Sequence, residues 1–131
     1  MRIAMIGTGY VGLVSGVCFS DFGHDVVCVD KDQRKIDMLE QGETPIFEPG
    51  VKRLMSNNVN ADRLTFKLDL KQAIKGADAV FIAVGTPTRR GDGHADLTYV
   101  MAAAEEIARA AQNYVVVVSV VRVFGTNGGL N

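Results

Sequence analysis

The chain has 131 residues, of which 47% are hydrophobic and 22% are charged, and its formal net charge is −1 at pH 7. These values predict one globular domain at residues 1–131, long enough to bury a core and too short for two domains. The near-neutral charge excludes the basic surface that binds nucleic acid or an anionic membrane, and no apolar run approaches the roughly 20 residues of a membrane span. We therefore expect neither nucleic acid nor a membrane as a partner.

Residues 1–30 predict a strand, a glycine-rich turn, a helix and a second strand that ends in an acid. The strand covers residues 2–6, the turn covers residues 7–12, and the helix runs on to residue 22. The second strand, at residues 25–29, leads directly to Asp30. A glycine fingerprint in this setting is typical of dinucleotide-binding domains, whereas the same glycines without the strand, helix and acid would indicate only an ordinary turn.

Each glycine of the turn has a distinct expected role. Gly7 allows a tight turn, Gly9 lets a pyrophosphate approach the backbone, and Gly12 allows the helix to pack closely on the strand. The N-terminus of the helix offers unpaired N–H groups and the positive end of the helix dipole. We therefore expect a diphosphate to bind at this turn.

An acid and a lysine extend the expected site toward a ribose. Asp30 lies 18 residues after Gly12 (30 − 12), which is close to the separation typical of the fingerprint. Its carboxylate can accept hydrogen bonds from an adenosine ribose and would repel a 2′-phosphate, so NAD is favoured over NADP. Lys35, one turn into the next predicted helix at residues 31–39, either reaches a ribose hydroxyl or a phosphate oxygen or is a solvated surface lysine.

The remaining elements complete an α/β, doubly wound parallel sheet with the expected strand order 3-2-1-4-5. In the first helix, we expect Leu13, Val14, Val17 and Cys18 to face the sheet. Further helices are expected after Pro49, Asp69 and Asp96, and further strands at residues 64–67, 77–84 and 114–118. The helix after Asp96 is expected to have one apolar face, made by Leu97, Val100, Ala104, Ile107, Ala108 and Ala111.

The turn Gly85-Thr86-Pro87 follows the fourth predicted strand. Ligands of open α/β sheets bind beyond the carboxyl ends of the strands, at the point where the strand order reverses. Because the fourth strand is expected beside the first, this turn belongs over the cofactor. Thr86 is either a hydrogen-bond donor to NAD or a structural threonine of the turn.

The two cysteines, Cys18 and Cys28, fall on a predicted helix and a predicted strand, and we expect both to be buried core residues. Their positions predict neither a disulfide framework nor a metal site. The N-terminus starts directly in a strand without a signal-peptide pattern, so a cytoplasmic location is expected by default.

These motifs together resemble the N-terminal NAD-binding domain of the UDP-glucose/GDP-mannose dehydrogenase family, and most closely its UDP-glucose 6-dehydrogenase branch. The resemblance implies oxidation of a sugar C6 alcohol to a carboxylate in two NAD-dependent steps. It also implies NAD contacts at Tyr10, Val11, Asp30, Lys35 and Thr86. The matching segments are residues 1–14, Gly23-His24, Val29-Asp30, Lys35-Ile36, residues 45–50, residues 84–88 and residues 91–97.

The resemblance breaks after the fifth predicted strand. Aligned on Gly125-Thr126, the chain has Val121 where the family has a threonine that serves the active site, and Val123 where the family has a proline. The resemblance places the catalytic cysteine and lysine in later segments, and Cys18 and Cys28 match neither position. We therefore name no catalytic residue for this chain.

We expect the central helical and nucleotide-sugar-binding domains of the family to be absent, so that the chain alone is not catalytic and meets a nucleotide sugar only through those missing domains. The alternatives are a GDP-mannose 6-dehydrogenase-type domain and a free-standing NAD-binding or interaction module without redox chemistry. The gene sequence beyond residue 131 would separate these hypotheses. Apolar surface left uncovered by the missing domains makes a homo-oligomer a further expectation.

Overall fold

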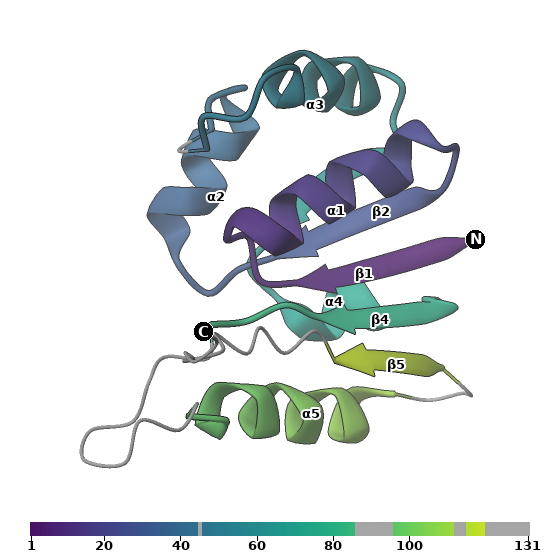
Figure 1. The fold of residues 1–131 in the computed structure, drawn as a ribbon. Helices are drawn as coiled ribbons and strands as arrows, with labels where there is room; N and C mark the ends of the chain where they lie inside the picture. Colours follow the sequence, from purple (N-terminus) through teal and green to yellow (C-terminus); the bar gives the residue numbers. More distant parts are fainter. Residues whose placement is uncertain (45, 86–95, 112–114, 120–131) are drawn as a thin grey trace, which may run out of the picture.

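A computed structural model of the chain describes residues 1–44, 46–85, 96–111 and 115–119. Within these residues, parallel strands form one sheet in the order β3-β2-β1-β4-β5 (Figure 1). This order and the fold class agree with the prediction from sequence. The strands are β1 (Arg2–Ile6), β2 (Asp25–Val29), β3 (Leu64–Lys67), β4 (Ala79–Ile82) and β5 (Val116–Ser119).

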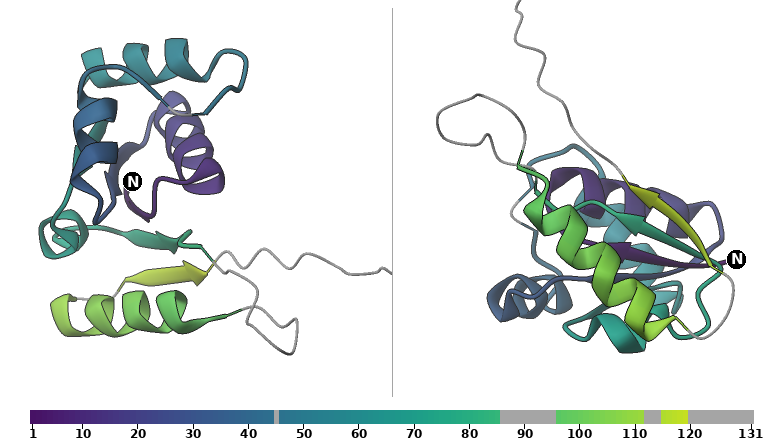
Figure 2. Two further views of the ribbon diagram at one scale, coloured as in Figure 1. Left: turned by 90° about the vertical axis from the view of Figure 1, so that its left-hand side faces the viewer. Right: turned by 90° about the horizontal axis from the view of Figure 1, so that it is seen from below.

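Helices cover both faces of the sheet, as Figure 2 shows. On one face lie α1 (Tyr10–Asp21), α2 (Gln33–Glu40) and α3 (Val51–Asn60). On the other face lie α4 (Leu70–Ile74) and α5 (Thr98–Ala110). No helix of the described residues is long and apolar enough to cross a membrane.

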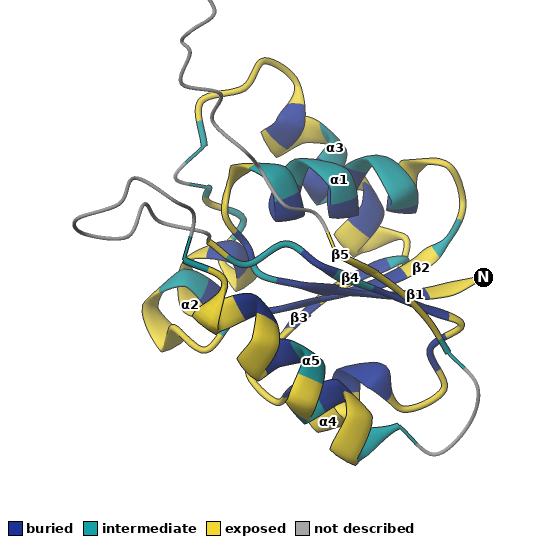
Figure 3. Ribbon diagram, turned by 60° about the horizontal axis from the view of Figure 1, so that its bottom comes forward, coloured by how far each residue is buried: buried dark blue, intermediate teal, exposed yellow. Residues whose placement is uncertain are grey.

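The alternation of side chains along the strands explains why both faces need a cover. In β1, Ile3 and Met5 pack among the side chains of α1, α2 and α3, whereas Ala4 and Ile6 pack against α4 and α5. All of these side chains are buried, and the buried surfaces of the helices turn toward the sheet in Figure 3. Strands made almost entirely of apolar residues are expected where helices cover both faces of a parallel sheet.

The face of α1 that meets the sheet differs from the predicted one. Leu13 and Val17 are fully buried as expected, and Val14 is half-buried but packs against the same core, whereas Cys18 is only half-buried. The buried positions instead include Gly12, Gly16 and Ser20. The helix approaches the sheet so closely that small residues form much of the contact. The spacing of large apolar side chains in the sequence does not indicate these small buried positions.

The predicted apolar face of the last helix is also partly wrong. Val100 and Ile107 are buried, but Ala108 is exposed and Leu97 keeps 44% of its surface exposed, while the buried third position is Ala103. The helix starts at Thr98, one residue later than expected, although the Asp96 carboxylate accepts a hydrogen bond from the backbone N–H of Thr98 at 2.9 Å, as a capping residue would. This start places Leu97 at the solvent-exposed entry to α5.

Candidate functional site

The carboxyl ends of the central strands meet at one edge of the sheet. Ile6 is in register with Val29 of β2 and with Ile82 of β4. Beyond this edge lies a cleft of about 1110 Å³. Its walls come from the turns after β1, β2, β3 and β4 and from one side of α5. Of the predicted site residues, it is lined by Gly7, Gly9, Tyr10, Val11, Asp30, Lys35 and Gly85.

The fold itself requires Gly7 and Gly12. Gly7 has a φ of +106°, and a Cβ there would lie 2.6 Å from the carbonyl oxygen of Ala83. A Cβ on Gly12 would lie 2.0 Å from the carbonyl oxygen of Gly7. The first glycine thus allows the turn, and the second allows α1 to begin directly against it.

Gly9 is different, because the fold gives no reason for a glycine there. Its φ of −73° and ψ of −168° are accessible to any residue. Among the described residues, no heavy atom outside its chain neighbours lies within 4 Å of the position of a Cβ. The open space adjoins the N-terminus of α1, where Gly9 supplies no side-chain cap. Backbone N–H groups at the first turn of a helix are a common binding site for a diphosphate, and the open space at Gly9 lies beside them.

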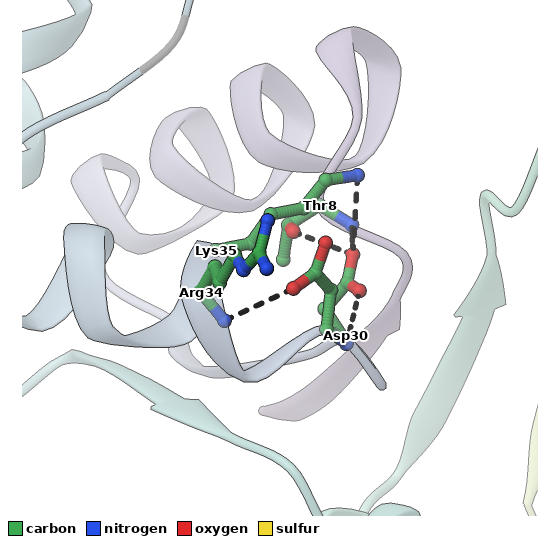
Figure 4. A network of polar contacts seen from close by, with 5 residues as sticks. Thr8, Asp30, Arg34 and Lys35 are labelled. Atoms are coloured by element: carbon green, nitrogen blue, oxygen red, sulfur yellow. Dashed lines mark hydrogen bonds and ion pairs between the residues drawn. The ribbon is translucent and has the colours of Figure 1, made fainter.

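The Asp30 carboxylate is held by hydrogen bonds from Thr8 and Asp32 (Figure 4). Its Oδ2 accepts the Thr8 hydroxyl at 2.7 Å and the Thr8 backbone N–H at 3.1 Å. Its Oδ1 accepts the backbone N–H of Asp32 at 2.9 Å. Asp32 in turn caps α2 by accepting the N–H of Arg34 at 3.0 Å, which explains why this helix begins at Gln33 and not at residue 31.

The surroundings of Asp30 act on its pKa in opposite directions. Burial raises the pKa, whereas the hydrogen bonds from Thr8 and Asp32 and the charge of Lys35 lower it, and the net pKa lies below the ordinary value of 3.8. The carboxylate is therefore ionised at neutral pH.

Lys35 and Tyr10 lie at the cleft with partners of their own. The Lys35 Nζ is 3.9 Å from Asp30 Oδ2, and 45% of its side chain is exposed, so it can also meet a ligand. The Tyr10 hydroxyl donates a hydrogen bond to Glu48 Oε2 at 2.8 Å. This bond joins the start of α1 to the loop before α3.

Other predicted positions fall outside the described residues. Thr86 and Pro87 lie there, as do Val121 and Val123. The structure therefore places only Gly85 of the predicted cofactor turn at the cleft.

The sequence prediction missed Thr8 and Glu48. Thr8 lies between two fingerprint glycines, at a position for which the fingerprint specifies no residue type. Its role is visible only in the structure, where 2% of its surface is exposed and its hydroxyl donates a hydrogen bond to Asp30. Glu48 is distant in sequence from Tyr10, so nothing local signals their contact. It does lie in the Glu-Pro-Gly segment that carries part of the family resemblance.

The cysteines do not contribute chemistry to the cleft. Both are free, Cys28 is buried as expected, and burial raises the pKa of its thiol to about 12. Cys18 is only half-buried, contrary to the prediction. In the part of the chain that the structure describes, no group of His, Cys, Asp and Glu side chains is arranged to hold a metal ion.

A doubly wound parallel sheet, with an open glycine turn before α1 and an acid after β2, is the architecture of a Rossmann-type dinucleotide-binding domain. The comparison with protein families makes this class more specific. The model of the UDP-glucose/GDP-mannose dehydrogenase family, NAD binding domain, matches residues 1–127. The chain belongs to this family, and the cofactor of the domain is NAD.

Individual relatives agree with the family match. The chain is 66% identical over 119 residues to UDP-glucose 6-dehydrogenase of Rhizobium meliloti, which covers 91% of this chain and 27% of that protein. A solved ternary complex of GDP-mannose dehydrogenase from Pseudomonas aeruginosa is 40% identical with a TM-score of 0.84, over 92% of this chain and 29% of that one. A UDP-glucose dehydrogenase from Pyrobaculum islandicum is 39% identical with a TM-score of 0.83, over 98% and 30%. The chain thus spans a little over a quarter of the length of these relatives.

Proposed function

We propose that this chain is the NAD-holding part of a UDP-glucose 6-dehydrogenase, which oxidises UDP-glucose to UDP-glucuronate in two NAD-dependent steps. The observation that carries the proposal is the open space at Gly9, because the fold needs no glycine there and a bound pyrophosphate does. The identity of 66% to a UDP-glucose 6-dehydrogenase supports this substrate over GDP-mannose, whose dehydrogenase is 40% identical over a similar share of the chain.

Within this proposal, the residues of the cleft divide the binding of NAD among them. The N–H groups of Tyr10 and Val11 hold the pyrophosphate, with Gly7, Gly9 and Gly12 shaping the turn. Asp30 accepts a ribose hydroxyl, and Lys35 adds a positive charge near the same sugar. Gly85, Thr86 and Pro87 are proposed to cover the cofactor beside β4. NAD, when bound, supplies the acceptor for the two electrons that each oxidation step removes.

The wider assignments belong to the same proposal. Residues 1–131 form one domain, and recognition of the sugar nucleotide is assigned to parts of the relatives that the match does not include. The two free thiols suit a cytoplasmic, reducing location. Self-association is proposed through the exposed valines of β5, Val116, Val117 and Val118, which form one edge of the described sheet.

Calorimetric titration with NAD and NADP tests the assignment of the cleft. We expect the chain to bind NAD and to prefer it to NADP. Gly9→Val should remain folded, because the fold leaves room for the side chain, and should lose NAD binding, because the side chain fills the pyrophosphate space. Gly12→Val is the matched control: it places a Cβ on the carbonyl oxygen of Gly7 and should fail to fold. A folded Gly9→Val variant with unchanged NAD affinity would remove the glycine turn from the site.

The substrate is tested separately, in the protein that carries this chain together with the other regions of its relatives. NADH formation should follow UDP-glucose and not GDP-mannose. Faster turnover of GDP-mannose would favour the second branch of the family while leaving the NAD site intact.

A further inference from the structure

Thr8 is a buried polar residue inside the cofactor turn. It stands between Gly7 and Gly9, and only 2% of its surface is exposed. Its hydroxyl and its backbone N–H both donate to the same oxygen, Oδ2 of Asp30, at 2.7 Å and 3.1 Å. The turn that is expected to hold the pyrophosphate is thus bonded directly to the acid that is expected to hold the ribose.

The two hydrogen bonds from Thr8 limit how many further hydrogen bonds the Asp30 carboxylate can accept. Each carboxylate oxygen has two lone pairs, so the two bonds from Thr8 fill Oδ2. Among the described residues, Oδ1 accepts only the backbone N–H of Asp32, at 2.9 Å, which leaves its second lone pair available. The carboxylate is fixed at both oxygens, and Oδ1 keeps the free acceptor that a ribose hydroxyl can use.

We propose that Thr8 is a positioning residue for cofactor selection: its hydroxyl locks the Asp30 carboxylate in place, so that the cleft accepts a ribose with a free 2′-hydroxyl and rejects a 2′-phosphate. The inference rests on the proposed NAD site. Without the hydroxyl, the carboxylate keeps the weaker backbone bonds and can turn away from an incoming phosphate. Thr8 therefore acts through Asp30, while its own side chain stays buried beneath the ligand.

The alternative is that Thr8 only completes the turn. In that case its hydroxyl satisfies a buried polar group, and its loss disturbs the pyrophosphate-binding backbone. Such a disturbance weakens the binding of NAD and of NADP to the same extent, because both cofactors contain the pyrophosphate. The ratio of the two affinities therefore separates a positioning role from a structural one.

The experiment measures NAD and NADP affinities by calorimetry for the unmodified chain, Thr8→Val and Thr8→Ser. Thr8→Val keeps the shape and the backbone N–H but removes the hydroxyl, and we expect roughly ten-fold weaker NAD binding, the low end for losing a hydrogen bond to a charged group. The affinity for NADP should change much less, so the ratio of NAD affinity to NADP affinity should decrease. Thr8→Ser restores the hydroxyl and should restore the preference. Thr8→Ala repeats the comparison if Thr8→Val does not fold.

A double-mutant cycle with Asp30→Asn completes the test. If Thr8 acts through the carboxylate, Thr8→Val should no longer change the ratio of affinities once Asp30 is an amide. If Thr8→Val weakens the binding of NAD and of NADP by the same factor, so that the ratio of the two affinities is unchanged, the inference is overturned. The assignment of the NAD site would not be affected by that result. If the unmodified chain binds no NAD, the proposed function itself fails.

Discussion

At the scale of single residues, Asp30 shows how a binding group is kept charged while it is partly withdrawn from water. Burial alone would favour the protonated acid, but the Thr8 and Asp32 hydrogen bonds and the Lys35 charge favour the carboxylate more, so its pKa falls below 3.8. These contacts exist only in the folded chain. The ionised form of Asp30 therefore stabilises the fold as well as preparing the site.

The sign of this coupling gives the first prediction. A carboxyl whose pKa is lower in the folded state stabilises the protein above its unfolded pKa, and this contribution is lost as the pH falls through the folded value. We expect the free energy of unfolding to decrease as the pH is lowered below about 3.8, and Asp30→Asn to remove part of that decrease. Urea unfolding between neutral and acidic pH measures it.

Asp62→Asn is the control, because Asp62 precedes β3 and lies at the opposite end of that strand from the cleft. It should leave the Asp30 contribution in place. If Asp30→Asn and the unmodified chain lose stability in parallel, the hydrogen bonds of Thr8 and Asp32 do not couple to folding.

At the scale of elements, the contact of α1 with the sheet depends on the absence of side chains. A Cβ on Gly16 would lie 2.8 Å from the Sγ of Cys28, which is itself fully buried in β2. Glycine within a helix costs about 1 kcal/mol relative to alanine, so helix propensity favours a replacement that the packing opposes. The close approach decides the outcome, since interiors have little room for an added methyl group.

The second prediction is a coupling between these two positions. Gly16→Ala should lower the free energy of unfolding by roughly 1–3 kcal/mol, as overpacking does. Cys28→Ala should also destabilise, by leaving a small cavity. The double variant should be more stable than the sum of the two losses implies, because the alanine at position 16 then occupies space that the sulfur has left. Additive losses in urea unfolding would show that the sulfur does not set the helix–strand spacing.

Periodicity predicted which elements form but not always which side chains they bury. Leu13 and Val17 were predicted correctly because large apolar residues mark a face, whereas the buried Gly16 and Ser20 have no such mark. In α5, the identical chemistry of successive alanines hides which of them faces inward. The positions of Gly7, Gly9 and Asp30 at one cleft were predictable, because their spacing is tied to the strand and helix that carry them. The Thr8–Asp30 bond was not, since it depends on side-chain rotamers that only the assembled turn defines.

At the scale of the whole molecule, the cleft lies where the two halves of the sheet meet. One half supplies the turns after β1, β2 and β3, and the other supplies the turn after β4 and one side of α5. The ion pair between Lys31 Nζ and Glu106 Oε1, at 2.5 Å, joins the turn after β2 to α5. The Lys31 side chain is mostly exposed, so this pair contributes little to stability on its own. A cofactor that contacts both halves is expected to hold them together more effectively.

The last prediction follows from this position of the cleft. A ligand that binds only the folded chain stabilises it by mass action, by about 2.7 kcal/mol when its free concentration is 100 times Kd. For a domain of this length, that free energy corresponds to a rise in Tm of roughly 10 °C. We expect NAD to raise the Tm in proportion to the logarithm of its concentration above Kd, and NADP at the same concentration to raise it less.

Gly9→Val is the control and should have the same Tm with and without NAD, because its fold is intact and its pyrophosphate space is filled. A rise of equal size in Gly9→Val would mean that NAD stabilises the chain from somewhere other than the cleft, whereas a rise confined to the unmodified chain places the cofactor at the N-terminus of α1.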